Sequence, residues 1–338
     1  MTLNFHKLVP ARTTRRIAAL GVLASVAAAF LLVACAAKPY GVNAVASEHH
    51  TQTPDLPAPD FEVRGRIYFV SGDHIVRWSG GAIEQFSGGT SFESPRVSPD
   101  SRQIVAVEMG LNHSELVLLN GLGERIQLLT NNLSPNRVQD SAWARSPAWS
   151  PDGRSIAFVA DLGRWDLSIW RIPAGGGQVE LIHGFALGSG GGDTPSWSPD
   201  GTKVVFTGAR GAATQIFVAD LNTGNSTQIT NMADGAYDPA WSPTGDHIAF
   251  VVREGQEHNI WIAAPDGSEA RKLFGGGLKR APTWSADGEL MIYLGQDDDS
   301  FELFAARVFK GELLALSQAL KLTNDLEIDV RSGLSWRD

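Results

Sequence analysis

The sequence predicts an all-β fold, a six-bladed β-propeller, from three observations. First, a run of the form Ser/Thr-Pro-x-Trp-Ser-Pro-Asp-Gly recurs along the chain, with small variations. Second, its tryptophans Trp149, Trp197, Trp241 and Trp284 stand 48, 44 and 43 residues apart, which is the length of one four-stranded blade. Third, an incomplete copy at each end of the repeated region completes the other.

Each full copy is predicted to form four short strands in a fixed order. The first strand carries the Pro-x-Trp run and ends at a tight Ser-Pro-Asp-Gly turn, whose residue types favour turn geometry. The second and third strands are β-branched and aromatic, as at 156–159 and 169–172, and a polar loop separates them. The fourth strand is short, as at 228–230, and leads to the next copy.

The two ends of the repeated region predict how the ring closes. Five full copies cover residues 91–323. Residues 65–87 hold three strands without a first strand, and residues 332–338 hold a first strand, with Trp336, without the rest. We therefore expect the C-terminal strand to complete the N-terminal blade, because this pairing removes two exposed sheet edges.

The N-terminus has the pattern of an export signal. Residues 1–16 are basic and contain no acid, and residues 17–34 are apolar and rich in alanine. The only cysteine, Cys35, follows Leu-Val-Ala, and this order resembles the lipobox of bacterial lipoproteins. The resemblance implies cleavage before Cys35 and lipidation of its thiol. An ordinary cleavable signal or an uncleaved anchor is the alternative.

Domain boundaries and location follow from these patterns. We expect a lipoprotein signal peptide at 1–34, a flexible tether rich in Pro and small residues at 35–63, and the propeller at 64–338. The protein would then be extracytoplasmic and lipid-anchored to the cell membrane, on its periplasmic or cell-surface side. A formal net charge of −9 argues against nucleic acid as a partner. We expect a monomer.

The Pro-x-Trp-Ser-Pro-Asp-Gly repeats resemble the propeller of TolB and related WD40-like repeat proteins. The resemblance covers about residues 65–338. It implies a six-bladed propeller that serves as a platform for docking proteins. We expect an envelope protein or peptide as the partner and membrane contact through the lipid on Cys35.

The candidate binding residues lie on the face where the loops before each first strand meet those between second and third strands. Residues just before the first strands would rim the central channel and carry mixed charge, which suits a polar peptide: Glu93, Arg145, Asp193, Asp238, Arg280 and Arg331. Trp143 and Trp165 lie in loops on this face and resemble a hot-spot patch. Solvated surface for the rim, and burial for the two tryptophans, are the alternatives.

Catalytic motifs are missing from the sequence, so an enzyme is the less favoured hypothesis. The sequence contains no Gly-x-Ser-x-Gly and no His-Glu-x-x-His. A propeller hydrolase or lyase acting on envelope glycan or peptide at the channel mouth would need two carboxylates brought together from Glu93, Asp193 and Asp238. We expect no cofactor. Asp297, Asp298 and Asp299 are weak candidates for a Ca²⁺ site, and an exposed acidic loop is the favoured alternative.

Overall fold

The computed structural model describes residues 61–88, 91–134, 140–162, 166–185, 190–211, 213–309, 312–313 and 319–337. The predicted signal segment, Cys35 and most of the tether lie outside the described residues. At the end of the predicted tether, Val63 is buried and Phe61 packs against the same hydrophobic cluster. The last residues before the first strand therefore contribute to the propeller's core.

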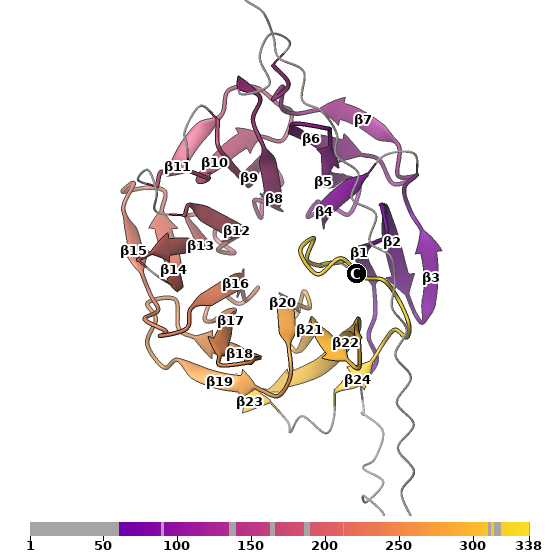
Figure 1. Ribbon diagram of the computed structural model, residues 1–338, viewed down its shortest axis with the longest axis vertical. Coiled ribbons are helices and arrows are strands. Elements are labelled where there is room, and N and C mark those ends of the chain that lie inside the picture. Colours follow the sequence, from indigo (N-terminus) through magenta and orange to yellow (C-terminus); the bar gives the residue numbers. More distant parts are fainter. Residues whose placement is uncertain are drawn as a thin grey trace, which may run out of the picture. The chain divides into compact units, whose positions relative to one another are not determined.

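Strands are the only regular elements in the described ranges, and they form six antiparallel sheets arranged around a central channel (Figure 1). Blade 1 consists of β25 (Ser335–Arg337), β1 (Arg66–Ser71), β2 (His74–Ser79) and β3 (Ala82–Gln85). Blade 2 consists of β4 (Phe92–Val97), β5 (Ile104–Met109), β6 (Ser114–Leu119) and β7 (Arg125–Leu128). Blade 3 consists of β8 (Ala144–Trp149), β9 (Ser155–Ala160), β10 (Ser168–Pro173) and β11 (Glu180–His183).

The remaining blades follow the same order. Blade 4 consists of β12 (Gly192–Trp197), β13 (Lys203–Arg210), β14 (Ala213–Asp220) and β15 (Ser226–Gln228). Blade 5 consists of β16 (Ala236–Trp241), β17 (Ile248–Glu254), β18 (Glu257–Ala263) and β19 (Arg271–Phe274). Blade 6 consists of β20 (Lys279–Trp284), β21 (Leu290–Asp297), β22 (Ser300–Phe309), β23 (Glu312–Leu313) and β24 (Leu320–Lys321).

The ring closes as predicted, and the six-bladed all-β fold is confirmed. The C-terminal strand β25 pairs antiparallel with β1, with Ile67 opposite Trp336 and Tyr68 opposite Ser335. It is the innermost strand of blade 1, where the repeat lacks a first strand of its own. We refer to β25, β4, β8, β12, β16 and β20 as the inner strands, because each lines the channel (Figure 1).

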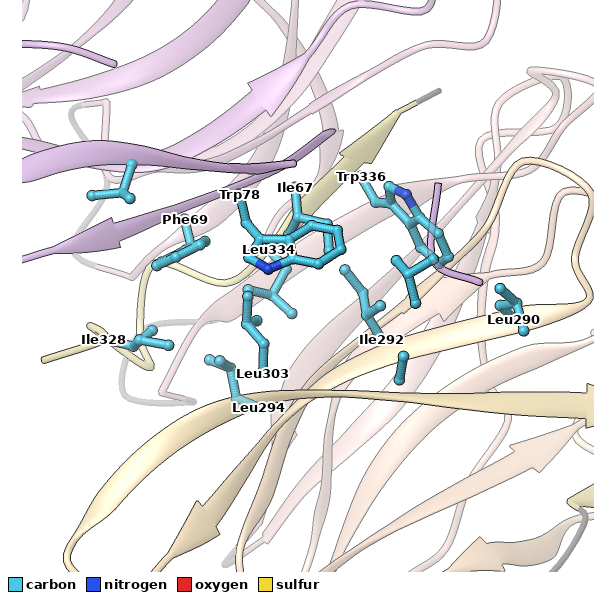
Figure 2. Close-up of a cluster of buried hydrophobic side chains, with 13 residues drawn as sticks. Ile67, Phe69, Trp78, Leu290, Ile292, Leu294, Leu303, Ile328, Leu334 and Trp336 are labelled. Carbon is cyan, nitrogen blue, oxygen red and sulfur yellow. The ribbon is translucent and has the colours of Figure 1, made fainter. Parts of the chain in front are cut away.

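The hydrophobic core is divided among the interfaces between neighbouring blades. Figure 2 shows the cluster between blade 1 and blade 6, where Trp78 and Trp336 lie across from Ile292 and Leu303. These side chains are no more than 6% exposed, so each contributes about 1.5–3 kcal/mol or more by burial. The other five interfaces hold equivalent clusters of buried residues. Neighbouring blades thus stabilise one another.

Three of the recurring tryptophans tie their inner strand to the blade before it. The indole N–H of Trp149 donates to the carbonyl of Arg96 at 2.9 Å, and that of Trp197 donates to the carbonyl of Ala148 at 3.0 Å. In blade 6, Trp284 donates in the same way to the carbonyl of Ala240 in blade 5. In blades 3, 4 and 6 the repeated tryptophan is therefore a packing residue between blades.

The recurring aspartates hold the turn that follows each inner strand. In blade 3, the hydroxyl of Ser150 donates to Asp152 at 2.6 Å and accepts from the backbone N–H of Ser155 at 2.9 Å. Asp152 also accepts from the backbone N–H of Arg154 at 3.0 Å. Blades 2, 4 and 6 repeat the Ser–Asp bond at 2.5–2.6 Å. The aspartates are therefore turn residues, as predicted.

Candidate binding face and central channel

A β-bulge interrupts each inner strand of blades 2 to 6 at its loop-side end. The register with the neighbouring strand shifts at the same place in all five. The residue before the proline at the bulge is not glycine, yet its φ is 46–52°. This backbone conformation is unusual for an L-residue and costs conformational free energy. These residues are Ser94, Ser146, Thr194, Asp238 and Ala281. In blade 1, Gly333 takes the equivalent place with a φ of 65°.

The bulge fixes which residues stand at the channel rim. One residue in each blade directly precedes the residue with positive φ and lies at the loop-side end of the inner strand. We call these six residues the rim positions: Glu93, Arg145, Asp193, Tyr237, Arg280 and Ser332. Four of them were among the predicted rim residues. The other two predicted residues, Asp238 and Arg331, occupy different places in the repeat. Counting two residues back from each proline would have identified Tyr237.

Two ion pairs join neighbouring blades across the rim. The carboxylate of Asp238 accepts from Arg280 Nε at 2.7 Å and from the backbone N–H of Ala281 at 3.2 Å. The Arg280 guanidinium also lies 4.8 Å from the ring centre of Tyr237. On the other side, Asp193 lies 3.5 Å from an Arg145 guanidinium nitrogen. Asp193 and Asp238 are therefore each paired with an arginine of a neighbouring blade.

The remaining rim carboxylate lies in a small cavity beside the rim. Glu93 lines this cavity of about 340 Å³ together with Asp329 and Arg331. Burial raises the pKa of Glu93, and the negative charge of Asp329 adds to the shift. Arg331 pairs with Asp329 at 3.3 Å. The structure thus brings Glu93 and Arg331 together in one cavity.

The channel itself forms a larger cavity of about 390 Å³. Its wall includes the residue that stands between the proline and the tryptophan of each copy, or in the equivalent place. We call these six residues the channel row: Arg96, Ala148, Ser196, Ala240, Thr283 and Ser335. Burial lowers the pKa of Arg96 to about 10, although Asp238 and Asp193 act in the opposite direction. Sequence reasoning missed Arg96, whose signal is a single charge at a position that is otherwise small.

Three exposed apolar side chains lie on adjoining loops of blades 2 and 3, and we call these three residues, Leu111, Leu133 and Trp143, the apolar patch. Trp143 is 38% exposed, and its backbone N–H donates to Asp161 at 2.9 Å. Leu111 and Leu133 are also exposed and lie on adjoining loops. Ser114 joins these loops, because its backbone N–H donates to the carbonyl of residue 142 and its hydroxyl bonds to Ala144. The second predicted tryptophan, Trp165, lies outside the described residues.

The predicted calcium candidates lie at the hairpin between β21 and β22. Asp297 forms an ion pair with Lys321, and Asp298 occupies the turn with a φ of 50°. In the part of the chain that the structure describes, no three His, Cys, Asp or Glu side chains are grouped as metal ligands would be. In the same part, none of the elements is an apolar helix of membrane-spanning length.

Comparison with known proteins identifies the repeats. The family model of the TolB β-propeller domain matches residues 86–315, which is more than half of the chain. No curated protein sequence matches the chain.

Solved structures share the fold at low sequence identity. TolB from Acinetobacter baumannii has a TM-score of 0.64 at 21% identity, covering 80% of this chain, which in turn spans only 66% of that protein. A TolB described as putative, from Agrobacterium tumefaciens, has a TM-score of 0.62 at 20% identity, over 80% of this chain and 92% of that one. Oligogalacturonate lyase from Vibrio parahaemolyticus reaches 0.50 at 15% identity, over 77% and 73%. The chain belongs to the TolB β-propeller domain family.

Proposed function

We propose that this chain is a membrane-anchored, extracytoplasmic scaffold that docks an envelope protein or peptide through its loop-rich face. The observation that carries the proposal is the exposed apolar patch formed by Leu111, Leu133 and Trp143 on adjoining loops. Large apolar side chains gathered on one face of a water-soluble body are typical of a protein-binding surface. Membership of the TolB propeller family is compatible with a scaffold of this kind.

The surroundings of the patch fit the anatomy of a protein interface. An interface commonly has an apolar centre and a polar rim, and arginine and tryptophan are enriched in it. Arg145 lies two residues after Trp143 in the sequence, and it forms the half-exposed ion pair with Asp193. We infer that the patch supplies the affinity and that the charged rim positions select the partner.

The anchor and the location rest on the sequence. The basic start, the apolar segment and Cys35 together favour export and lipidation. An extracytoplasmic location also accords with the family. Lipidation would hold the propeller near the bilayer, and the tether at 35–63 would give its loop face room to meet a partner.

A crosslinking pull-down from the native envelope tests the proposal, with the recovered protein then purified and titrated directly. The double variant Trp143→Ala/Leu133→Ala should weaken the affinity of that protein by roughly tenfold or more, as expected when a hot spot is lost. The matched control is Ile126→Ala/Leu128→Ala, which removes two exposed apolar side chains from the outer strand β7. Equal loss in both double variants, or in neither, would contradict docking through this face.

Cys35→Ser separates anchoring from docking. This variant should lose the covalently attached lipid, measured by mass spectrometry of the purified protein, because the thiol that accepts the lipid is gone. It should bind the purified partner with unchanged affinity. A wild-type protein that carries no lipid would exclude the lipid anchor without affecting the docking face.

An enzyme acting on envelope glycan or peptide is the second candidate, and one observation favours it. Glu93, whose pKa is raised by burial, shares a cavity with Asp329, and two neighbouring carboxyl groups can serve as an acid and a base. The test is cleavage of envelope glycan and peptide fragments, followed by mass spectrometry. Glu93→Gln should abolish cleavage, and the exposed control Glu289→Gln should preserve it. Lack of cleavage by the wild type would exclude this candidate.

A further inference from the structure

One position of the channel row departs from the other five. Ala148, Ser196, Ala240, Thr283 and Ser335 are small, whereas blade 2 places Arg96 in the same row. The same blade also has Val97 where the other inner strands carry tryptophan. A propeller blade needs no cation at this position for packing, since five of the six blades have none.

The backbone holds the Arg96 guanidinium at one edge and leaves the other edge open. Its Nη1 donates to the carbonyls of Pro95 at 2.8 Å and Ser332 at 3.0 Å. Among the described residues, Nε and Nη2 have no hydrogen-bond partner, and no carboxylate lies within ion-pair distance of Arg96. The nearby acids Asp193 and Asp238 are already paired with arginines of the rim.

The closing segment packs against this guanidinium. A Cβ built on Gly333 would lie 2.7 Å from Arg96 Nη2, so a side chain there would shift the end of the arginine. The positive φ of Gly333 also favours glycine. The C-terminal strand therefore both closes the ring and keeps room for Arg96.

Arginines outnumber acids in the channel lining of this acidic protein. Its charged lining consists of Arg96, Arg331 and Arg337 against the single acid Asp238. The chain as a whole has a formal net charge of −9. Arg96 is partly buried, and this burial lowers the pKa of its guanidinium although Asp238 and Asp193 act in the opposite direction. An anion in the channel would offset this desolvation.

We propose that the central channel is a binding site for a carboxylate, which the Nε and Nη2 edge of Arg96 grips with two parallel hydrogen bonds. This edge has the spacing that matches the two oxygens of a carboxylate. The five small residues of the row leave the space, and the cavity of about 390 Å³ has the size of a small-molecule site. The hydroxyls of Ser196 and Thr283 line the same cavity. Ser196 Oγ accepts from the backbone N–H of Trp241 and keeps its own proton to donate to a carboxylate, whereas the Thr283 hydroxyl donates to the carbonyl of Ala281.

Two sources present this group: a free small acid and the carboxylate end of a peptide. The site does not depend on the docking patch, because Trp143 and Leu133 lie outside the channel lining. Loss of docking and loss of anion binding are therefore separable results.

Calorimetric titration of the purified full chain tests the site. The probes are succinate, its neutral analogue succinamide, and one short peptide prepared with a free and with an amidated C-terminus. We expect saturable binding of succinate, of the free-acid peptide, or of both, and none of succinamide or the amidated peptide. Binding of succinate identifies a free-acid site, and binding of the peptide alone identifies a peptide-end site.

Substitutions in the row locate the binding. Arg96→Gln should weaken binding roughly tenfold or more, since hydrogen bonds to charged groups are the strong ones. The matched control Arg102→Gln removes an exposed arginine of the same blade outside the channel and should leave affinity unchanged. Ala240→Glu keeps Arg96 but adds a carboxylate to the row from blade 5, on the other side of the ring (Figure 1), and should block the probes.

Two results would overturn the proposal. One is the absence of saturable binding of both succinate and the free-acid peptide to the wild type. The other is equal affinity in the wild type and in either folded channel variant, Arg96→Gln or Ala240→Glu. Thermal unfolding of each variant shows whether it is folded. If Arg96→Gln does not fold, the affinity of Ala240→Glu for the probes tests the proposal.

Discussion

The two ends of the central channel are built from the same inner strands, yet the side chains repeat from blade to blade at one end and vary at the other. At the turn end, four blades repeat the same bond from a serine hydroxyl to an aspartate, at 2.5–2.6 Å. At the loop end, the bulge is repeated in the backbone, but the rim positions carry a different side chain in almost every blade. Repetition therefore marks what holds a blade together. Variation on a constant backbone marks where one blade can be distinguished from the next.

The channel row lies between these two ends and shows both behaviours. Five blades keep a small residue there, and only blade 2 introduces a charge, Arg96. The neighbouring tryptophan position is likewise constant except for Val97 of the same blade. A departure in one blade at two adjacent positions points to a local role for that blade.

The comparison holds only if the ring is closed, so the largest effect is expected from breaking the closure. Trp336→Ala removes a side chain that is 6% exposed, packs between blades 1 and 6, and donates to the carbonyl of Arg64 at 2.8 Å. We expect a loss of about 3–5 kcal/mol in the free energy of unfolding. Denaturant unfolding measures it. The exposed Trp143→Ala is the control and should change stability by less than about 0.5 kcal/mol.

The next effect contrasts the two ends directly. Ser150→Ala at the turn end removes the hydroxyl that bonds both Asp152 and the backbone N–H of Ser155, and should cost about 1–3 kcal/mol. Arg145→Gln at the loop end removes a half-exposed ion pair with Asp193 and should cost about 0–1 kcal/mol. Urea midpoints of both variants measure the difference. A larger cost at Arg145 would show that the rim, too, is primarily structural.

The sequence predicted what repeats and missed what departs from the repeat. Trp336 and the turn at Asp152 were predicted because most copies of the repeat have the same residue at the same spacing. Two predicted rim residues, Asp238 and Arg331, line the channel but occupy other places in the repeat than the remaining four, and counting two residues back from the proline gives Tyr237 in blade 5. Arg96 was overlooked because its environment depends on Gly333, more than two hundred residues away in sequence.

The turn aspartates also predict how the propeller responds to acid. The serine hydroxyl, and next the backbone N–H, lower the pKa of Asp100, Asp152, Asp200 and Asp287. A carboxyl with a lowered pKa in the folded state contributes stability that is present above the unfolded-state value of about 3.9. This contribution is lost as the pH falls from there through the lowered pKa.

Urea unfolding at a series of pH values from about 5 to below 3 measures this dependence, with the unfolded-state pKa of aspartate near 3.9 as its reference point. Stability should fall with decreasing pH in the wild type. Asp152→Asn removes one of the titrating groups and should give a slightly shallower fall. An unchanged pH profile in the variant would show that the turn aspartates do not carry the acid sensitivity.

The smallest expected effect tests whether the bulge stores backbone strain. Ala281 sits in the bulge of blade 6 with a φ of 52°, a conformation that costs an L-residue about 1–2 kcal/mol and glycine almost nothing. Ala281→Gly removes that cost. It also raises the conformational entropy of the unfolded chain, which destabilises the fold by about 0.5–1 kcal/mol, so the free energy of unfolding should be unchanged or slightly raised.

Ala240→Gly, in the neighbouring inner strand, makes the same substitution where φ is not positive, and should lose about 0.5–1 kcal/mol. Thermal unfolding of the two variants therefore separates strain at the bulge from the ordinary cost of glycine in a strand. Equal losses would mean that the bulge holds its alanine without strain. A gain in stability only in Ala281→Gly would show that the bulge is strained. The propeller then keeps this strained backbone at the place where it presents variable side chains at the rim.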